Sequence, residues 1–314
     1  MNEVVNMVEN VREDLSISRY KLSWGIPVPV DTEHTVYVWF DALINYLTGV
    51  GFADNGESYE KFWPADLHIV GKDILKFHAV YWPMFLMSAG IEPPKMVFAH
   101  GWWKIQGEKM SKSLKNVVDP FELSSVFGAD AIRYFMFREI SFGHDGDFSE
   151  DAIRRRYESD LAKDLGNLIL RTISMVEKYV GGSLEPVEDL TTQIDIDNIF
   201  KRWYDKMENL EFSEALTTVW ELVSFLNGFI DKTAPWTLYR VGDLERLKRF
   251  LWTTCRYIKF LAFMLFPFIP NTSIKIFQSL GIDFQSIRDD DKKKVIFSRM
   301  KTNVKNIGVL FPKV

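Results

Sequence analysis

The stretch Asp66-Leu67-His68-Ile69-Val70-Gly71-Lys72-Asp73 sets the interpretation of the first half of the chain. Its apolar run predicts a short strand over 66–70, and the apolar spacing over 74–89 predicts a helix directly afterwards. Further strands are expected over 35–39 and 96–100, with a helix over 41–48. Strands that alternate with helices are typical of a parallel α/β fold, in which ligands bind at the carboxyl ends of strands. We therefore expect a ligand site beside Gly71.

The second half of the chain has a different pattern. Ser149, followed by Glu150 and Asp151, is a typical helix start. Long amphipathic helices are expected over 150–180, 194–209, 212–231, 242–265 and 271–280. The fold class predicted is thus α/β followed by all-α, with a helix bundle in the second part. We place the boundary within 141–149, which gives domains at 1–148 and 149–314.

Composition excludes several classes of protein. The 314 residues are 47% hydrophobic and 15% aromatic, which is incompatible with a disordered or collagen-like chain. The single cysteine, Cys255, excludes a disulfide framework and a Cys-ligated zinc site, and no metal site is predicted. The longest apolar run, 260–270, is about half a membrane span, and the first residues lack a secretory apolar region. No membrane association is expected, and the expected location is cytoplasmic.

Charge differs between the two halves. Residues 1–150 carry 13 Lys and Arg against 21 Asp and Glu, whereas residues 151–314 carry 25 against 22. The second half could therefore present a basic face to a nucleic acid, although a solvated surface of mixed charge explains the same numbers.

The segment Gly107-Glu108-Lys109-Met110-Ser111-Lys112-Ser113 has the clearest chemical pattern. Lysines and serines in a loop behind a glycine can neutralise and hydrogen-bond a polyphosphate, although an exposed polar loop is the ordinary alternative. KMSKS at 109–113 is the signature loop of class I aminoacyl-tRNA synthetases, and the chain resembles the methionyl-tRNA synthetase family from about residue 10 to its C-terminus. The other segments that carry the resemblance are WGIPVP (24–29), YVWFDALINY (37–46), HIVGKDILKFH (68–78), FAHG (98–101), LGNLILR (165–171) and APW (234–236).

The resemblance implies the C-terminal half of a Rossmann-type nucleotide-binding fold, with the KMSKS loop and a stem-contact region, before an anticodon-binding bundle. It also implies a binding site for L-methionine, in which Tyr46 and His78 lie near the thioether sulfur and Asp41 or Asp73 orients the amino group or the ATP ribose. The residues implied for this site are Trp39, Asp41, Ala42, Leu43, Tyr46, Ile74, Phe77 and His78. Helical spacing independently places Trp39, Ala42, Leu43 and Tyr46 on one face, which ordinary core packing would explain equally well.

ATP, bound with Mg²⁺, is the second substrate implied. Its expected site consists of Gly71, Asp73, His100, Gly101, Met110 and Lys112. Lys109 and Lys112 are expected to stabilise the departing pyrophosphate, and Ser111 and Ser113 to donate hydrogen bonds to it. These four residues are the catalytic group implied by the resemblance.

In the helical half, Asn167 and Arg171 share one helix face, and Trp236 follows Pro235. A surface pair and a core tryptophan are the ordinary alternatives. The resemblance implies instead that all three bind the CAU anticodon of tRNA-Met, since amides, guanidinium groups and exposed rings suit unpaired bases.

The sequence also departs from the family. The HIGH signature does not occur in it, so the N-terminal half of the catalytic domain is expected to be missing and to be supplied in cis or as a separate chain. The isolated chain is therefore expected to be an inactive or very weak methionine–tRNA ligase with exposed apolar surface.

Three alternatives remain at this stage. A non-catalytic tRNA-binding module would use the bundle alone. A leucine or cysteine synthetase would share KMSKS but not the segments over 37–46 and 68–78, and the cysteine enzyme would need zinc ligands. A purely structural helical protein would leave the first 150 residues unexplained.

Overall fold

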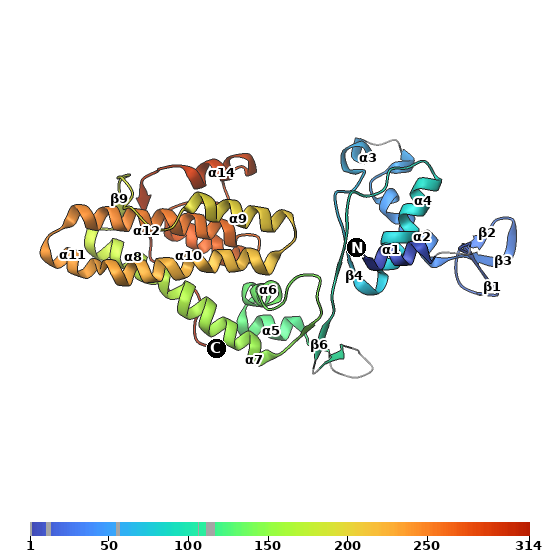
Figure 1. Ribbon diagram of the computed structural model, residues 1–314, viewed down its shortest axis with the longest axis horizontal. Helices are drawn as coiled ribbons and strands as arrows, with labels where there is room; N and C mark the ends of the chain where they lie inside the picture. The colour runs from blue at the N-terminus through green and yellow to red at the C-terminus, as the bar shows by residue number, and fades with distance from the viewer. Residues whose placement is uncertain (1, 11–13, 55–56, 106, 111–116) are drawn as a thin grey trace. The chain divides into compact units, whose positions relative to one another are not determined.

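The computed structural model describes residues 2–10, 14–54, 57–105, 107–110 and 117–314, which form two compact units (Figure 1). The first unit comprises residues 1–102 with 143–145, and the second comprises 103–142 with 146–314. Among the helices in the described ranges, even the 22-residue α10 and α12 lack the continuous apolar length that crossing a bilayer requires.

The first unit is a small α/β assembly. Its helices and helical turns are α1 (Asn2–Glu9), α2 (Val38–Gly49), a 3₁₀ turn (Phe52–Asp54), α3 (Glu57–Phe62), a 3₁₀ turn (Lys72–Ile74), a π-helical turn (Phe77–Tyr81) and α4 (Trp82–Ser88). Its strands are β1 (Ser18–Tyr20), β2 (Pro27–Val28), β3 (Asp31–Val36), β4 (His68–Gly71) and β5 (Val97–His100). The first three strands form an antiparallel sheet in the order β1-β3-β2.

Strands β4 and β5 confirm the predicted parallel arrangement. They pair in parallel, with His68 opposite Val97 and Gly71 opposite His100. A helical turn begins at Lys72, directly after β4. The carboxyl ends of both strands, together with the residues that follow them, therefore lie at one edge of this sheet.

The strand predicted over 35–39 lies earlier in the chain than expected, at Asp31–Val36. Strand β3 ends at Val36, and Val38 and Trp39 already lie in the first turn of α2. The β-branched and aromatic residues there have strand propensity, but burial of Leu43 and Leu47 in the core with Trp82 favours an earlier helix start. Tertiary packing therefore sets this boundary.

The second unit is mainly helical. Its helices are α5 (Pro120–Phe127), α6 (Ala129–Arg138), α7 (Glu150–Arg156), a π-helical segment (Tyr157–Gly166), α8 (Asn167–Val180), α9 (Ile196–Glu208), α10 (Phe212–Thr233), α11 (Pro235–Val241), α12 (Leu244–Leu265), α13 (Pro270–Ser279) and α14 (Asp289–Phe297). Its strands are β6 (Trp103–Ile105), β7 (Glu108–Lys109), β8 (Gly146–Asp147), β9 (Ser183–Leu184) and β10 (Thr302–Asn303). Figure 1 shows α8, α9, α10 and α12 side by side, and contacts join α10 to α9 and α12, and α12 to α8.

The predicted bundle helices are confirmed. The stretch 150–180 is helical throughout, and the Ser149 side chain caps it by accepting a hydrogen bond from the Ala152 N–H. Its middle is a π-helical segment, which the sequence pattern did not predict. The apolar faces of these helices share one extensive core, which includes the fully buried Leu226 and Phe250.

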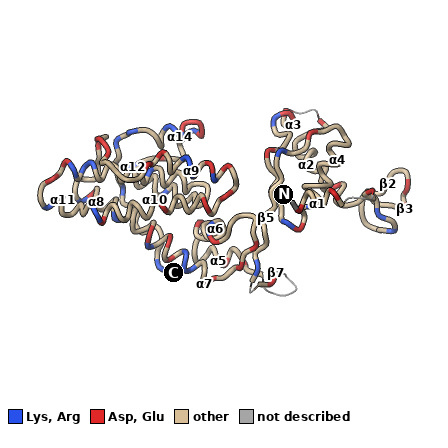
Figure 2. The backbone as a smooth tube through the Cα atoms, viewed as in Figure 1, with Lys and Arg blue, Asp and Glu red and all other residues tan. Residues whose placement is uncertain are grey.

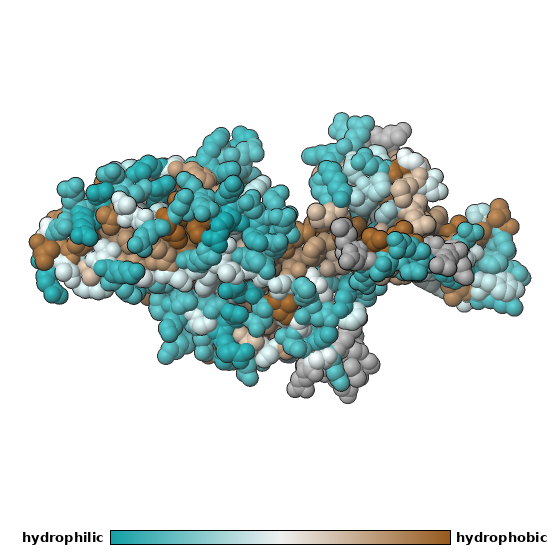
Figure 3. All heavy atoms as spheres, in the orientation of Figure 1, coloured by the Kyte–Doolittle hydropathy of each residue, from teal (hydrophilic) through white to brown (hydrophobic). Residues whose placement is uncertain are grey.

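Charged and large apolar side chains are both exposed on the surface of the protein. Lys and Arg are interspersed with Asp and Glu along the bundle helices (Figure 2), so the surface of mixed charge fits better than a single basic face. The first unit exposes large apolar side chains, notably Trp24 at 83% and Val30 at 93%. Apolar patches are visible on both units in Figure 3.

Candidate functional site

A hydrogen-bonded tyrosine–histidine pair lies at the centre of the first unit. The Tyr46 hydroxyl on α2 is 2.9 Å from Nε2 of His78, and Nδ1 of His78 is 3.0 Å from the Ile74 carbonyl oxygen. Because a carbonyl oxygen only accepts, Nδ1 carries a proton, and in the neutral imidazole Nε2 then accepts the hydrogen bond from Tyr46. The imidazole is thereby held in one orientation, and burial raises the pKa of the Tyr46 hydroxyl.

Stacked aromatic rings lie next to this pair. The rings of Trp39 and Phe77 are parallel, with centroids 4.1 Å apart, and the His78 ring meets Trp39 edge-on at 6.0 Å. The structure thus brings together Trp39, Tyr46, Phe77 and His78 from α2 and the π-helical turn. Such a face suits a thioether, because sulfur packs favourably against aromatic rings.

The other four residues predicted for methionine take different positions. Leu43 is buried in the core, Ile74 contributes its carbonyl oxygen to His78, and Asp41 and Ala42 are exposed on α2. Asp41 also lines a groove of about 600 Å³, whose other walls include Trp24, Ile26 and Tyr37. The WGIPVP segment therefore lies beside the start of α2.

His68 is a member of this cluster that sequence reasoning did not single out. It is buried on β4, its ring centroid lies 4.3 Å from that of Tyr46, and its Nε2 has no hydrogen-bond partner in the described part of the chain. Burial lowers the pKa of His68, and proximity to His78 lowers it further.

The shifted pKa of His68 predicts an acid-sensitive fold. Folding favours the neutral imidazole, so this stability is fully present above the unfolded-state pKa of about 6.5 and is lost as pH falls from there through the lower folded-state pKa. Replacing His68 by Gln should flatten the decline in unfolding free energy below about pH 6.5. Urea unfolding of both proteins across this range measures the difference, and parallel curves would contradict the prediction.

A second cluster gathers at the carboxyl ends of β4 and β5. The Lys72 ammonium is 2.5 Å from Oδ1 of Asp145 and 4.0 Å from the centre of the Trp102 ring. Asp145 also accepts a hydrogen bond of 2.9 Å from the Trp102 backbone N–H, and the Trp102 indole donates to Asp73 at 3.1 Å. The predicted residues Gly71, Asp73, His100 and Gly101 all lie at this edge, as the strand topology required.

Lys72, Trp102 and Asp145 were not predicted as site residues. Lys72 follows Gly71 directly, which was the one available signal, whereas Asp145 is 73 residues away and its partners are set by the fold alone. The cluster places a cation, a carboxylate and an indole where α/β folds bind nucleotides.

Only part of the KMSKS segment lies within the described residues. Lys109 is on β7 and pairs with Lys104 of β6, and the Gly107 N–H donates to Asp147 at 2.9 Å. Ser111, Lys112 and Ser113 lie outside the described residues, and Met110 is partly exposed. The described start of the loop is therefore a short hairpin of the second unit.

Of the three anticodon residues predicted from sequence, Arg171 and Trp236 lie near the C-terminal end of α10. Arg171 of α8 forms an ion pair with Asp231 of α10, with Nη2 and Oδ1 2.7 Å apart. Three residues later, Ala234 adopts a left-handed conformation that ends α10 and starts α11 at Pro235. Trp236 is 42% exposed, so the alternative that it is a core residue is wrong.

Two further features at this end were missed by sequence reasoning. Asp231 orients the Arg171 guanidinium, and Tyr179 stacks on Tyr239 with ring centroids 4.7 Å apart. Asn167 is exposed on α8, one turn before Arg171. The arrangement offers an amide, a guanidinium and an exposed indole, which together can bind unpaired bases.

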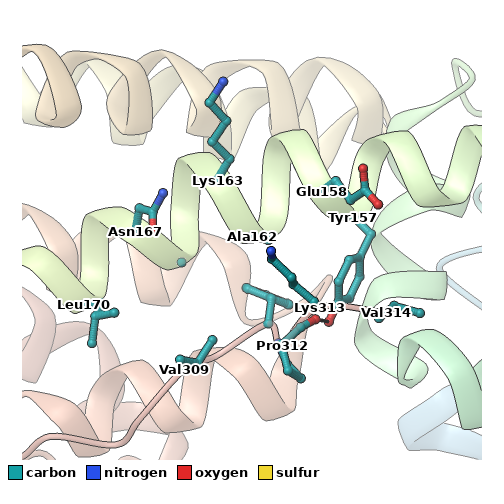
Figure 4. A pocket seen from close by; sticks show the side chains of 12 residues that line it. Tyr157, Glu158, Ala162, Lys163, Asn167, Leu170, Val309, Pro312, Lys313 and Val314 are labelled. Carbon is teal, nitrogen blue, oxygen red and sulfur yellow. Dashed lines mark hydrogen bonds between the residues drawn. The ribbon is translucent and has the colours of Figure 1, made fainter.

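A groove of about 570 Å³ extends from Asn167 along the π-helical segment (Figure 4). Its second wall is the segment 309–314, held by a hydrogen bond of 2.7 Å from the Tyr157 hydroxyl to the Pro312 carbonyl oxygen. Its lining includes Lys163 and Lys313 as well as Glu158, so side chains of both charges lie along the groove (Figure 4).

The described residues were also compared with the ligand sets that hold metal ions in proteins. Within the described ranges, no group of three or more His, Cys, Asp or Glu side chains is arranged to hold a metal.

The parallel sheet, whose carboxyl edge is where α/β folds bind nucleotides, and the helix bundle together form the architecture of a class I aminoacyl-tRNA synthetase. Residues 1–173 match the family described as "tRNA synthetases class I (M)", and residues 180–314 match the "Anticodon binding domain of methionyl tRNA ligase". The chain belongs to the methionyl-tRNA synthetase family, which confirms the resemblance and the fold class inferred from the sequence.

Relatives and solved structures agree with this assignment. The chain is 44% identical over 321 residues to the methionine–tRNA ligase of Caldanaerobacter subterraneus subsp. tengcongensis, covering 100% of this chain and 50% of the relative. It is 41% identical over 322 residues to that of Bacillus subtilis, covering 100% and 48%. The Mycobacterium tuberculosis methionyl-tRNA synthetase in complex with methionyl-adenylate superposes with a TM-score of 0.90 at 39% identity, covering 99% of this chain and 62% of that one. The chain thus spans about half the length of the curated relatives that it matches.

Proposed function

We propose that the chain carries the C-terminal part of the catalytic centre, and the anticodon-reading bundle, of a methionine–tRNA ligase. The observation that carries this proposal is the aromatic cluster around the Tyr46–His78 hydrogen bond. This cluster would bind a thioether, and it lies in the same unit as the carboxyl ends of β4 and β5, where α/β folds bind nucleotides. The M. tuberculosis relative in complex with methionyl-adenylate supports the same pairing of ligands.

Methionine is the proposed amino-acid substrate. Its thioether would pack on Trp39 and Phe77, and the ordered Tyr46–His78 pair would lie near the sulfur. Asp41, or Asp73 at the sheet edge, would bind the ammonium group, and the other would bind the ATP ribose. An aromatic wall with a single hydrogen-bonded polar pair favours an unbranched, polarisable side chain over a charged one.

Activation would occur by attack of the methionine carboxylate on the ATP α-phosphorus, which forms methionyl-adenylate and releases pyrophosphate. Gly71, His100 and Gly101 would form the adenosine side of the site, with Met110 and the KMSKS loop on the phosphate side. Lys109 and Lys112 would neutralise charge on the pyrophosphate, and Ser111 and Ser113 would donate hydrogen bonds to it. Mg²⁺ would enter with ATP, bound to oxygens of its phosphates.

Transfer of methionine to tRNA-Met would be directed by the bundle. Asn167 and Arg171 would contact base edges of the CAU anticodon, while Trp236 would stack on a base. We place the catalytic and anticodon-binding domains at 1–148 and 149–314, and the activity in the cytoplasm.

The first unit supports the further proposal that an N-terminal segment completes the catalytic domain, in cis or as a separate chain. Within the described residues, the parallel sheet has only the strands β4 and β5, and Ile69 on β4 is 53% exposed. Parallel sheets are normally covered on both faces. An added N-terminal half would extend this sheet and bury the exposed apolar side chains of the unit.

Methionine-dependent exchange of pyrophosphate into ATP tests the catalytic proposal. We expect negligible exchange by the chain alone and recovery of exchange when the N-terminal half of a relative is added. Lys112→Ala should then lower exchange, because the pyrophosphate loses a cation in the transition state. Full exchange by the chain alone would contradict the need for a complement. Failure to recover exchange, with CAU binding retained, would identify a non-catalytic RNA-binding module.

A further inference from the structure

A small groove on the bundle is lined by none of the residues implied for the anticodon. It has a volume of about 270 Å³ and lies between α10 and the loop that precedes α9. The residues that give it its chemical character are Thr191, Gln193, Ser224, Phe229, Gly228 and Lys232. Pockets for drug-sized ligands start at about 300 Å³, so this groove suits one planar ring better than a whole cofactor.

Gly228 is the unusual residue of this groove. It lies in the interior of α10, where glycine is less favourable than alanine. A Cβ on Gly228 would meet nothing within 4 Å, whereas one on Gly166 would meet the Leu161 carbonyl oxygen at 3.2 Å and Phe311 at 3.4 Å. Protein packing therefore explains the glycine at 166 but not the one at 228, where the missing side chain leaves the groove open.

The walls of the groove present hydrogen-bonding groups that the protein leaves unused. In the described part of the chain, the side chains of Thr191, Gln193, Ser224 and Lys232 have no hydrogen-bond or ion-pair partner. Phe225 and Phe229 stack within the same groove, with ring centroids 5.6 Å apart. An amide, two hydroxyls, an ammonium group and aromatic surface are the groups that bind a nucleobase and its phosphate.

The groove reaches a residue that is close in the chain to the proposed anticodon residues. Lys232 follows Asp231, which holds Arg171, and lies four residues before Trp236. We propose that this groove binds one further nucleotide of the tRNA anticodon loop, outside the CAU triplet, with its base over Gly228 and its phosphate at Lys232. This inference rests on the proposed function of the bundle.

Filling the groove tests the inference. Gly228→Leu places a good helix former in the groove and should weaken binding of an RNA hairpin with CAU in its loop roughly tenfold. Gln278→Leu adds a leucine at an exposed position of α13 and should leave binding unchanged. Gly228→Ala should raise the thermal unfolding midpoint, which shows that the glycine is not required for folding. If Gly228→Leu does not fold, Gln193→Ala and Lys232→Ala on the groove walls should each weaken binding severalfold.

Hairpins with single abasic nucleotides identify the occupant. One abasic position outside CAU should weaken binding to the wild-type chain and have no further effect on Gly228→Leu, because the base and the leucine compete for the same space. Wild-type affinity of Gly228→Leu, or equal abasic losses in both proteins, would overturn the inference. The proposed function would survive that result if CAU is still preferred over a changed anticodon. Loss of that preference in the wild-type chain would refute both.

Discussion

Replacing Gly101 by alanine is expected to destabilise the first unit by about 3–5 kcal/mol. A Cβ on Gly101 would lie 2.2 Å from the backbone carbon and oxygen of His144, and such overlap with main chain is relieved only by moving the segment 143–145. That movement would pull Asp145 away from Lys72 and from the Trp102 N–H. The overlap and the two lost interactions act in the same direction.

Hydrogen exchange of peptides from β4 and β5 measures this effect within the first unit. Gly101→Ala should accelerate exchange of both strands, because their carboxyl ends lose the contact with residues 143–145. Gly49→Ala is a matched control, since Gly49 lies in the last turn of α2 and a Cβ there meets nothing within 4 Å. Slow exchange retained in Gly101→Ala would show that the segment 143–145 does not stabilise the sheet edge.

The close approach of Gly101 to the His144 backbone shows where prediction from the sequence reaches its limit. Local pattern was sufficient for the helices of the bundle and for the strand–glycine–helix junction at Gly71, because each depends on residues a few positions apart. It was sufficient for the Trp39–Tyr46 face as well, since the spacing of those residues fixes one side of α2.

Contacts between residues that are far apart in the sequence could not be predicted from local sequence patterns. The contact of Gly101 with His144, and the pair of Lys72 with Asp145, depend on how the chain returns to β5 after an excursion into the second unit. Likewise, no spacing rule predicted that Asp231 holds Arg171 or that Gly228 opens a groove. Resemblance to a family supplied residue identities at these sites but not their partners.

The π-helical segment over 157–166 is a related case. Its side chains have ordinary helical amphipathicity, so the pattern predicted a single α-helix over 150–180. Within the segment, buried Asp160 accepts hydrogen bonds from the Tyr134 hydroxyl at 2.7 Å and from Arg156 at 3.1 Å. Because Tyr134 lies on α6, a tertiary interaction accompanies the local change of helix type immediately before Asn167.

Trp236→Ala is expected to weaken binding of a CAU hairpin by about 5- to 150-fold, because stacking of one base on an aromatic ring contributes about 1–3 kcal/mol. The indole is 42% exposed at the start of α11, and Pro235 before it is buried, so the ring is presented on a fixed backbone. Removing an exposed ring should change the unfolding free energy little.

Comparison with Tyr204→Ala separates recognition from general loss of aromatic surface. Tyr204 on α9 is 48% exposed, close to the value for Trp236, but lies outside the residues implied for the anticodon. Hairpin titrations should show wild-type affinity for Tyr204→Ala and partial recovery for Trp236→Phe, which keeps a stacking surface. Trp236→Ala should weaken binding of the CAU hairpin and of a changed-anticodon hairpin by similar factors, because stacking does not depend on base identity and the base edges are left to Asn167 and Arg171. Wild-type affinity of Trp236→Ala for the CAU hairpin would contradict the prediction, because the exposed side chain at the α10–α11 junction would then contribute nothing to binding.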